Sequence, residues 1–114
     1  FERVLTRRRR VGEMLGHAGV ITAEDVRVDD RALVPGYGLF SEEVREAIRL
    51  TAVKSGILLD PTYTGKAMAG LFSLIRSGEL GPGSKVVFLH TGGTPALFGY
   101  PELVTEGRAP ALSA

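Results

Sequence analysis

The sequence predicts an α/β fold in which short parallel strands alternate with helices along the chain. Two apolar runs, GILLD at residues 56–60 and VVFL at residues 86–89, have the length of strands, and a segment with helical periodicity precedes each of them. Strands that are apolar at every position are typical of parallel sheets covered by helices on both faces. Alternation of such strands with helices is typical of α/β domains.

The first predicted helix lies around TRRRRVGEML at residues 6–15, with an apolar face made of Val4, Val11, Met14, Leu15 and Ala18. The run Arg7–Arg10 occupies mostly the remaining surface, so we interpret it as a solvated helix face. Phosphate binding is the alternative, but no aromatic residues interleave with these arginines and no wider basic stripe extends them. With 14 basic and 13 acidic residues the net charge is +1, and the sequence favours no nucleic-acid partner.

A short strand at residues 26–28 and a turn at PGYG, residues 35–38, come next. Ser41 is a suitable N-cap for a second helix, and the two glutamates after it place carboxylates in the first turn, where the helix dipole favours them. Gly56 is a suitable residue to end this helix. Its predicted apolar stripe consists of Val44, Ala47, Ile48 and Thr51.

The second strand, at residues 56–60, should stop at Asp60 because the following proline cannot donate to a sheet. A third helix is predicted from Lys66 to about Gly78, with an apolar face of Ala67, Met68, Leu71, Phe72, Leu74 and Ile75. The third strand is VVFL, and a short helix should follow Pro95. We assign residues 1–100 to the folded part and residues 101–114 to a flexible tail.

Three short strands would make a narrow sheet with unpaired edges. The chain also begins at Phe1 rather than methionine, so we expect a piece of a longer protein whose other strands lie upstream. No apolar run approaches the roughly 18 residues that a membrane helix needs, and there is no cysteine. These observations favour a soluble, cytoplasmic protein without a membrane partner, and no spacing of ligand residues predicts a metal site.

Three loops follow the carboxyl ends of the predicted strands, where open α/β sheets bind ligands. They carry Tyr37, Tyr63 and the pair Gly92 and Gly93. Each tyrosine is either a proton donor or acceptor, or a packing residue with its hydroxyl in water. The glycines either let the backbone approach an anion or form a tight turn.

Two further residues have alternative interpretations. Lys66 is either a Schiff-base lysine or a solvated surface lysine, since it opens a helix. His90, at the end of a strand, is more simply a satisfied core histidine than a catalytic base. The residues alone therefore predict a small-molecule site built from loops and do not specify a reaction.

The three loop segments VPGYGLFSEEVREAIRL, GILLDPTYTGKAMAGL and VVFLHTGGTPALFGY, in this order and spacing, resemble the D-cysteine desulfhydrase and 1-aminocyclopropane-1-carboxylate deaminase family. The resemblance covers about residues 27–100. It implies the C-terminal part of a tryptophan-synthase-β-like parallel-sheet domain with flanking helices, of fold type II, with pyridoxal 5'-phosphate as cofactor. It also implies that the Schiff-base lysine and the phosphate cup lie upstream, so that Lys66 is not the cofactor lysine.

The resemblance assigns roles to individual residues. Tyr37 and Tyr63 match two catalytic tyrosines that flank the substrate and cofactor. Thr91 matches a position near the pyridine nitrogen, and together with Thr64 and Gly92 it is expected to bind the cofactor. The chain departs from the family pattern at Phe40, Thr62 and Thr94, each of which could reshape the pocket without removing a named chemical group.

Deaminases of this family typically read YEGK and HLGG, whereas this chain reads YTGK and HTGG. A glutamate near the ring nitrogen would keep it protonated and strengthen the electron sink, while a threonine only shares a hydrogen bond. The resemblance therefore implies a D-cysteine desulfhydrase-like lyase that eliminates the β-substituent of a D-amino acid to give pyruvate, ammonia and sulfide.

Three alternatives stay open beside this reaction. They are a 1-aminocyclopropane-1-carboxylate deaminase, an L-cysteate sulfo-lyase, and a non-catalytic α/β remnant or interaction domain. The expected partners are a small amino-acid substrate, the upstream part of the same enzyme, and a second copy in a homodimer. Without the upstream lysine, this chain alone should be inactive.

Overall fold

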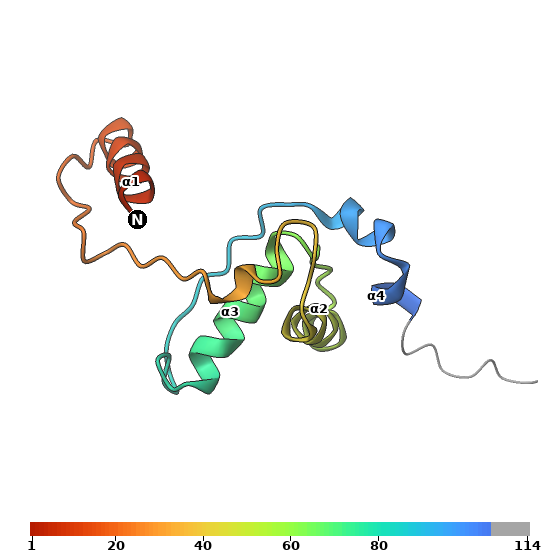
Figure 1. Cartoon of the computed structure of the whole chain (residues 1–114). Helices are drawn as coiled ribbons and strands as arrows, with labels where there is room; N and C mark the ends of the chain where they lie inside the picture. The colour runs from red at the N-terminus through yellow and green to blue at the C-terminus, as the bar shows by residue number, and fades with distance from the viewer. Residues whose placement is uncertain (106–114) are drawn as a thin grey trace, which may run out of the picture.

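The computed structural model describes residues 1–105, which form helices joined by irregular segments (Figure 1). The α-helices of this part are α1 (Glu2–Met14), α2 (Glu42–Ser55), α3 (Thr64–Arg76) and α4 (Pro101–Thr105). Two short 3-10 helices, η1 (Arg31–Leu33) and η2 (Thr94–Gly99), lie next to them in the chain. Helices α2 and α3 pack together at the centre, and the segment before η2 runs alongside α3.

Within residues 1–105 none of the three predicted strands forms, so the expected parallel sheet is not present. The segments 26–28, 57–59 and 86–89 run without regular structure instead. A strand exists only where a neighbouring strand completes its ladder of hydrogen bonds, and these segments do not pair with one another here. Val26 and Leu59 of these segments are buried, but most of the other apolar side chains are exposed, as Val87 shows at 95% exposure.

Helix α2 matches its prediction closely. Ser41 is its N-cap, and Gly56 ends it in the left-handed conformation with φ of 70°. The predicted stripe of Val44, Ala47, Ile48 and Thr51 is the buried face. The helix therefore follows from local signals, namely the cap, the stripe and the terminal glycine.

Helix α3 begins at Thr64, two residues earlier than predicted. The carboxylate of Asp60 accepts hydrogen bonds from the backbone amides of Thr62, Tyr63 and Thr64, which lie at the start of the helix (2.7–2.8 Å). These amides have no partners inside the helix, so the aspartate caps it from four residues upstream. At the other end, Arg76 forms a two-fold ion pair with Glu46 of α2.

The hydrophobic core lies between α2, α3 and the segments that cross them. Leu59 is fully buried in it although its predicted strand does not form. Partly buried residues from η1, the 86–89 segment and α4 complete the packing. The buried members are Val44, Ala47, Ile48, Leu59, Ala69 and Leu97.

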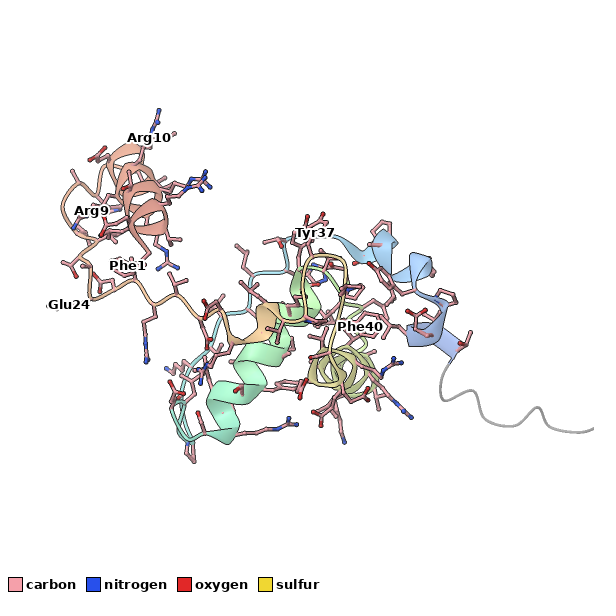
Figure 2. The ribbon with its side chains drawn as sticks, viewed as in Figure 1. Phe1, Arg9, Arg10, Glu24, Tyr37 and Phe40 are labelled. Carbon is pink, nitrogen blue, oxygen red and sulfur yellow. The ribbon has the colours of Figure 1, made fainter. Side chains whose placement is uncertain are left out.

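Helix α1 stands apart from this core (Figures 1 and 2). The arginine run is exposed, as predicted, and Arg10 points away from the rest of the chain in Figure 2. The predicted apolar face is exposed as well, because only Leu5 and Gly12 of the helix are buried. Within the described residues no helix is long and apolar enough to cross a membrane.

The segment assigned to a flexible tail begins with α4, whose residues Pro101–Thr105 are helical. Leu103 of this helix packs against the hydrophobic core. The rest of that assignment, residues 106–114, lies outside the described residues. The predicted short helix after Pro95 is present as η2.

Candidate active site

Asp60 organises the loop that carries Tyr63. It is completely buried, and besides the three backbone amides it accepts a hydrogen bond of 2.6 Å from the hydroxyl of Thr64. Burial by itself disfavours the charged carboxylate, but the hydrogen bonds from Thr64, Tyr63 and Thr62 together outweigh it and lower the pKa of Asp60. The loop is therefore built around a buried carboxylate that stays ionised.

Tyr37 and Tyr63 meet at the surface, and their hydroxyl oxygens lie 2.8 Å apart. The rings pack edge to face with centroids 6.0 Å apart, while the residues are 81% and 56% exposed. The hydrogen bond to Tyr37 is the main cause that raises the pKa of Tyr63, and the negative charge of Asp60 adds to it. Tyr63 is thus protonated at neutral pH and, as part of the pair, can donate or relay a proton.

The two threonines predicted to bind the cofactor have different surroundings. Thr64 is buried, and its hydroxyl also accepts a hydrogen bond from the backbone amide of Asp60 at 2.9 Å. Thr91 is exposed, and its hydroxyl has no hydrogen-bond partner among residues 1–105. Thr91 is therefore free to contact a ligand, whereas Thr64 would have to leave Asp60 to do so.

The glycine pair brings the third loop against Asp60. Gly93 has φ of 90°, and a side chain there would meet the Asp60 carboxylate at 2.8 Å, so this position requires glycine. Gly92 has φ of 97° and faces open space. The Gly92 amide donates to Nδ1 of His90 at 3.2 Å and its α-carbon faces open space, while Gly93 allows the close approach to the Tyr63 loop.

His90 helps to tie this loop to the preceding segment. Its Nε2 lies 3.0 Å from the carbonyl oxygen of Leu58, and the hydroxyl of Thr94 donates to the same oxygen at 3.3 Å. The imidazole is satisfied, as predicted, but it lies at the surface rather than in the core. The prediction of a core histidine is wrong because the strand that would bury it has no neighbours here.

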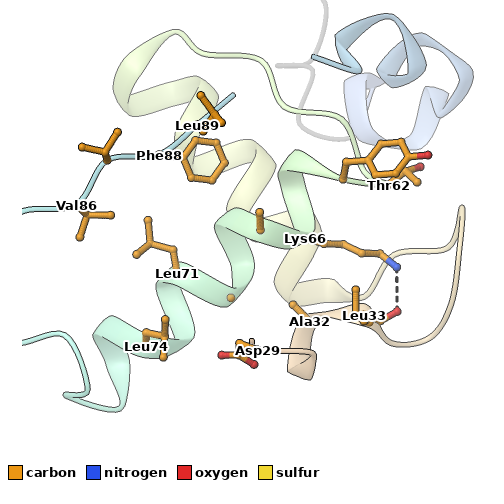
Figure 3. Close-up of a pocket in the computed structure, with 14 residues that line it drawn as sticks. Asp29, Ala32, Leu33, Thr62, Lys66, Leu71, Leu74, Val86, Phe88 and Leu89 are labelled. Atoms are coloured by element: carbon orange, nitrogen blue, oxygen red, sulfur yellow. Dashed lines mark hydrogen bonds between the residues drawn. The ribbon is translucent and has the colours of Figure 1, made fainter. Parts of the chain in front are cut away.

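Lys66 is buried, so its interpretation as a solvated surface lysine is wrong. Its Nζ donates hydrogen bonds to the carbonyl oxygen of Leu33 at 3.0 Å, which Figure 3 shows, and to that of Gly36 at 2.5 Å. Sequence reasoning missed this contact and the role of Asp60. The aspartate had a local signal, since a carboxylate before the first turn of a helix is a common cap, but the lysine contact joins residues 30 and 33 positions apart.

A groove of about 530 Å³ lies between α3 and the 86–89 segment (Figure 3). Apolar side chains such as Leu71, Leu74 and Phe88 line most of it. Tyr63 lies at its edge, but Tyr37 and Thr91 do not line it. The groove and the exposed tyrosine pair therefore share Tyr63.

Comparison with known proteins identifies the family of this chain. Residues 4–92 match the family described as pyridoxal-phosphate dependent enzymes. The chain belongs to this family. Pyridoxal phosphate is the cofactor of the family, so the resemblance recognised in the three loops and the predicted cofactor are confirmed.

Similar proteins of known name are deaminases. The chain is 43% identical over 106 residues to the 1-aminocyclopropane-1-carboxylate deaminase of Pseudomonas syringae pv. tomato, covering 93% of this chain and 31% of that protein. The protein of the same name from Pseudomonas syringae pv. syringae is 49% identical, covering 76% and 26%. A probable 1-aminocyclopropane-1-carboxylate deaminase of Schizosaccharomyces pombe is 41% identical, covering 85% and 29%. The chain thus spans less than a third of the length of these relatives.

The residues present here fit one side of a pyridoxal-phosphate site. The cofactor carries a ring nitrogen and oxygen substituents that need hydrogen-bond partners. The unpartnered hydroxyl of Thr91 and the exposed tyrosine pair offer such partners, and open space lies beside the α-carbon of Gly92, whose amide donates to Nδ1 of His90 at 3.2 Å. Within residues 1–105 no cluster of side chains suited to a metal ion occurs.

Proposed function

We propose that the longer protein is a pyridoxal-phosphate-dependent enzyme that releases ammonia from a small amino acid, and that this chain forms one wall of its site. The hydrogen bond of 2.8 Å between the hydroxyls of Tyr37 and Tyr63 carries the proposal. Two phenol hydroxyls from loops 26 residues apart form a hydrogen bond in an exposed position, where a packing role would bury the rings instead. Family membership supplies the cofactor.

In the longer protein, the segments 57–59 and 86–89 pair as strands with upstream segments in a tryptophan-synthase-β-like sheet. Their exposed apolar residues, Leu58, Val87 and Leu89 among them, support this assignment, because burial on both faces is typical of parallel strands. The apolar groove beside α3 is then covered by that sheet. The cofactor-linked lysine belongs to the upstream part, since Lys66 is already bound to the loop before Tyr37.

Each residue of the wall has a distinct task. Bound pyridoxal phosphate would withdraw electrons from the substrate α-carbon. Thr91 would donate to or accept from the ring nitrogen, and Gly92 would let the backbone approach the ring. Tyr63, which is protonated, gives a proton to the substrate, and Tyr37 resupplies it through their shared hydrogen bond.

Two reactions remain candidates. The names of the relatives favour ring opening of 1-aminocyclopropane-1-carboxylate, in which water is consumed and 2-oxobutanoate and ammonia form. Thr64 and Thr91 favour β-elimination from D-cysteine, in which water is consumed and pyruvate, ammonia and sulfide form. The weaker electron sink of a threonine suffices when a thiol leaves, since a thiol is a good leaving group. A β-elimination of sulfite from L-cysteate is a variant of the second reaction.

The first test replaces the tyrosines in the protein extended upstream to its natural start. We expect Tyr63→Phe to lower kcat for the better substrate by about 10²–10⁴-fold, because it removes the proton donor. Tyr37→Phe should lower kcat as well, while Thr105→Val in α4, which removes a hydroxyl far from the pair, should have no effect. Full activity of Tyr63→Phe would contradict the proposal.

The second test decides between the two reactions by measuring 2-oxobutanoate, pyruvate and sulfide from each substrate. If positions 64 and 91 select the reaction, Thr64→Glu combined with Thr91→Leu should move activity from thiol elimination towards ring opening. Thr91→Leu alone is the matched variant, because it leaves the contact between Thr64 and Asp60 intact. An unchanged substrate preference in both variants would reject selection by these positions.

The alternative from a different functional class is a non-catalytic α/β remnant or interaction domain. Added pyridoxal phosphate should give the absorption band of a lysine-bound cofactor in the extended protein but not in this chain alone. Absence of the band in both proteins would favour the remnant. The tyrosine pair would then need another explanation.

A further inference from the structure

Lys66 is a buried lysine that the proposed chemistry does not use. The other two lysines of the chain, Lys54 and Lys85, are exposed, whereas Lys66 is 5% exposed. Burial of an amine is unfavourable unless hydrogen bonds compensate for the lost water. The burial of Lys66 therefore indicates a specific contact.

That contact is with the backbone of a single loop. Nζ of Lys66 donates to the carbonyl oxygens of Leu33 and Gly36, which lie four residues and one residue before Tyr37. Among the residues that the structure describes, no carboxylate forms an ion pair with this lysine. Figure 3 shows its side chain reaching from α3 across to the loop.

Within this loop Leu33 and Leu39 are both mostly exposed, and apolar packing holds only its ends, where Ala32 and Phe40 contact the hydrophobic core. On the other side of Tyr37, the hydroxyl of Tyr100 donates to the carbonyl oxygen of Gly38 at 2.7 Å. Tyr37 thus stands between two places where a side chain holds the backbone. The contact with Lys66 comes from α3, whose N-cap residue is Tyr63.

Tyr63 is the N-cap of α3, and Lys66 lies in the first turn of this helix, three residues later. This short stretch both presents the Tyr63 hydroxyl and fixes the loop that brings the Tyr37 hydroxyl to it. We propose that Lys66 is a positioning residue that sets the contact between the hydroxyls of Tyr37 and Tyr63. The inference rests on the proposed function, in which this contact moves a proton.

The test uses the extended enzyme with 3-fluorotyrosine at position 63, whose ¹⁹F resonance reports the contact with Tyr37 without any turnover. Lys66→Met keeps a similar stem and removes the donors. We expect this variant to shift the ¹⁹F resonance and the phenol titration to the values of Tyr37→Phe. Its kcat should fall about 10²-fold with little change in KM, because a displacement of about 1 Å can cost that much.

Three matched variants sharpen the result. Lys66→Arg keeps a cation with several donors and should retain most of the ¹⁹F signature, and Lys54→Met, at an exposed position, should behave like the parent. In the Tyr37→Phe background, Lys66→Met should change neither the resonance nor kcat further, since the lysine acts through Tyr37. An unchanged resonance in Lys66→Met, or losses that add in the double variant, would overturn the proposal.

Two further outcomes are distinguishable. If circular dichroism shows that Lys66→Met is unfolded, Lys66→Gln, with a donor on a shorter stem, is measured in its place, and an unchanged resonance there overturns the proposal equally. If the proposed function fails instead, Tyr37→Phe leaves kcat unchanged while the resonance still responds to Lys66→Met. That pattern supports positioning by Lys66 and rejects the proton transfer.

Discussion

At the scale of single residues, the candidate site depends on buried polar groups that hold exposed ones. Asp60 and Lys66 lie on the two sides of Tyr63 in the sequence, and both are buried. Asp60 fixes the backbone of the Tyr63 loop, and Lys66 fixes the loop of Tyr37. Exposed phenols have many rotamers available, so fixed backbones are needed to keep their hydroxyls at 2.8 Å.

The lowered pKa of Asp60 predicts a pH dependence of stability. A carboxyl group whose pKa is lower in the folded state stabilises the fold above its usual pKa of 3.8 and loses this contribution as the pH falls through the folded-state value. We expect Asp60→Asn to lower the free energy of unfolding at neutral pH, and the difference from the parent to shrink below about pH 4. Urea unfolding between pH 3 and pH 7 measures this.

The control for this experiment is Asp30→Asn, at an exposed position before η1. It should follow the parent at every pH. A deficit of Asp60→Asn that stays constant down to the lowest pH would contradict a role for the ionised carboxylate. It would indicate that asparagine only disturbs the packing of the loop.

The resemblance, rather than residue types alone, predicted that the two tyrosines lie together. The resemblance named Tyr37 and Tyr63 as members of one site, and their hydroxyls are in contact. Residue types and spacing alone do not decide whether each tyrosine transfers protons or only packs against its neighbours. Lys66 was mistaken for a surface residue because nothing local in the sequence indicates that a loop some 30 residues earlier will cover it.

At the scale of elements, predictions succeeded where the signals were local. Helix α2 has its N-cap residue, its apolar stripe and its terminal glycine within 16 residues. The stripe and the glycine act as predicted, whereas the side chain of Ser41, at the N-cap position, makes no capping hydrogen bond. Helix α3 begins two residues before its predicted start. The sequence indicates Asp60 as the end of a strand, but in the structure this residue caps the helix. The segments around residues 58 and 87 were read as strands because they are apolar, but a strand also requires a neighbour.

The segment before α3 still contributes to stability without being a strand. Leu59 is fully buried in the core, whereas the preceding Leu58 is 44% exposed. We expect Leu59→Ala to lower the free energy of unfolding by about 2–5 kcal/mol, because it leaves a cavity among α2, α3 and η2. Leu58→Ala is the matched control and should cost about 0.5 kcal/mol in this chain.

The urea midpoint and slope of each variant give these values. Equal losses for the two leucines would show that the segment is not held in the core as described. A change in slope for Leu59→Ala would indicate that the substitution alters the compactness of the unfolded or folded state rather than stability alone.

At the scale of the whole molecule, residues 1–105 form helices and loops without the parallel sheet that the sequence predicts. Val87 and Leu89 are largely exposed beside a groove lined by α3. In the described part of the chain the backbone of this segment is thus unpaired and its apolar side chains are exposed, a combination that natural proteins normally cover. The predicted fold class therefore depends on segments outside this chain, which spans 26–31% of the relatives named above.

This dependence predicts a difference in hydrogen exchange. The amides of residues 86–89 donate no hydrogen bond within the described part of the chain, so in the 114-residue protein they should exchange at nearly the rate of an unfolded peptide. In the protein extended upstream they should become protected, because neighbouring strands accept from them. The amides in the middle of α2 should be protected in both proteins and serve as the internal reference.

Two outcomes would contradict this prediction. Fast exchange at residues 86–89 in the extended protein would contradict the sheet, and protection of these amides in the 114-residue protein would mean that they find a partner without the upstream part.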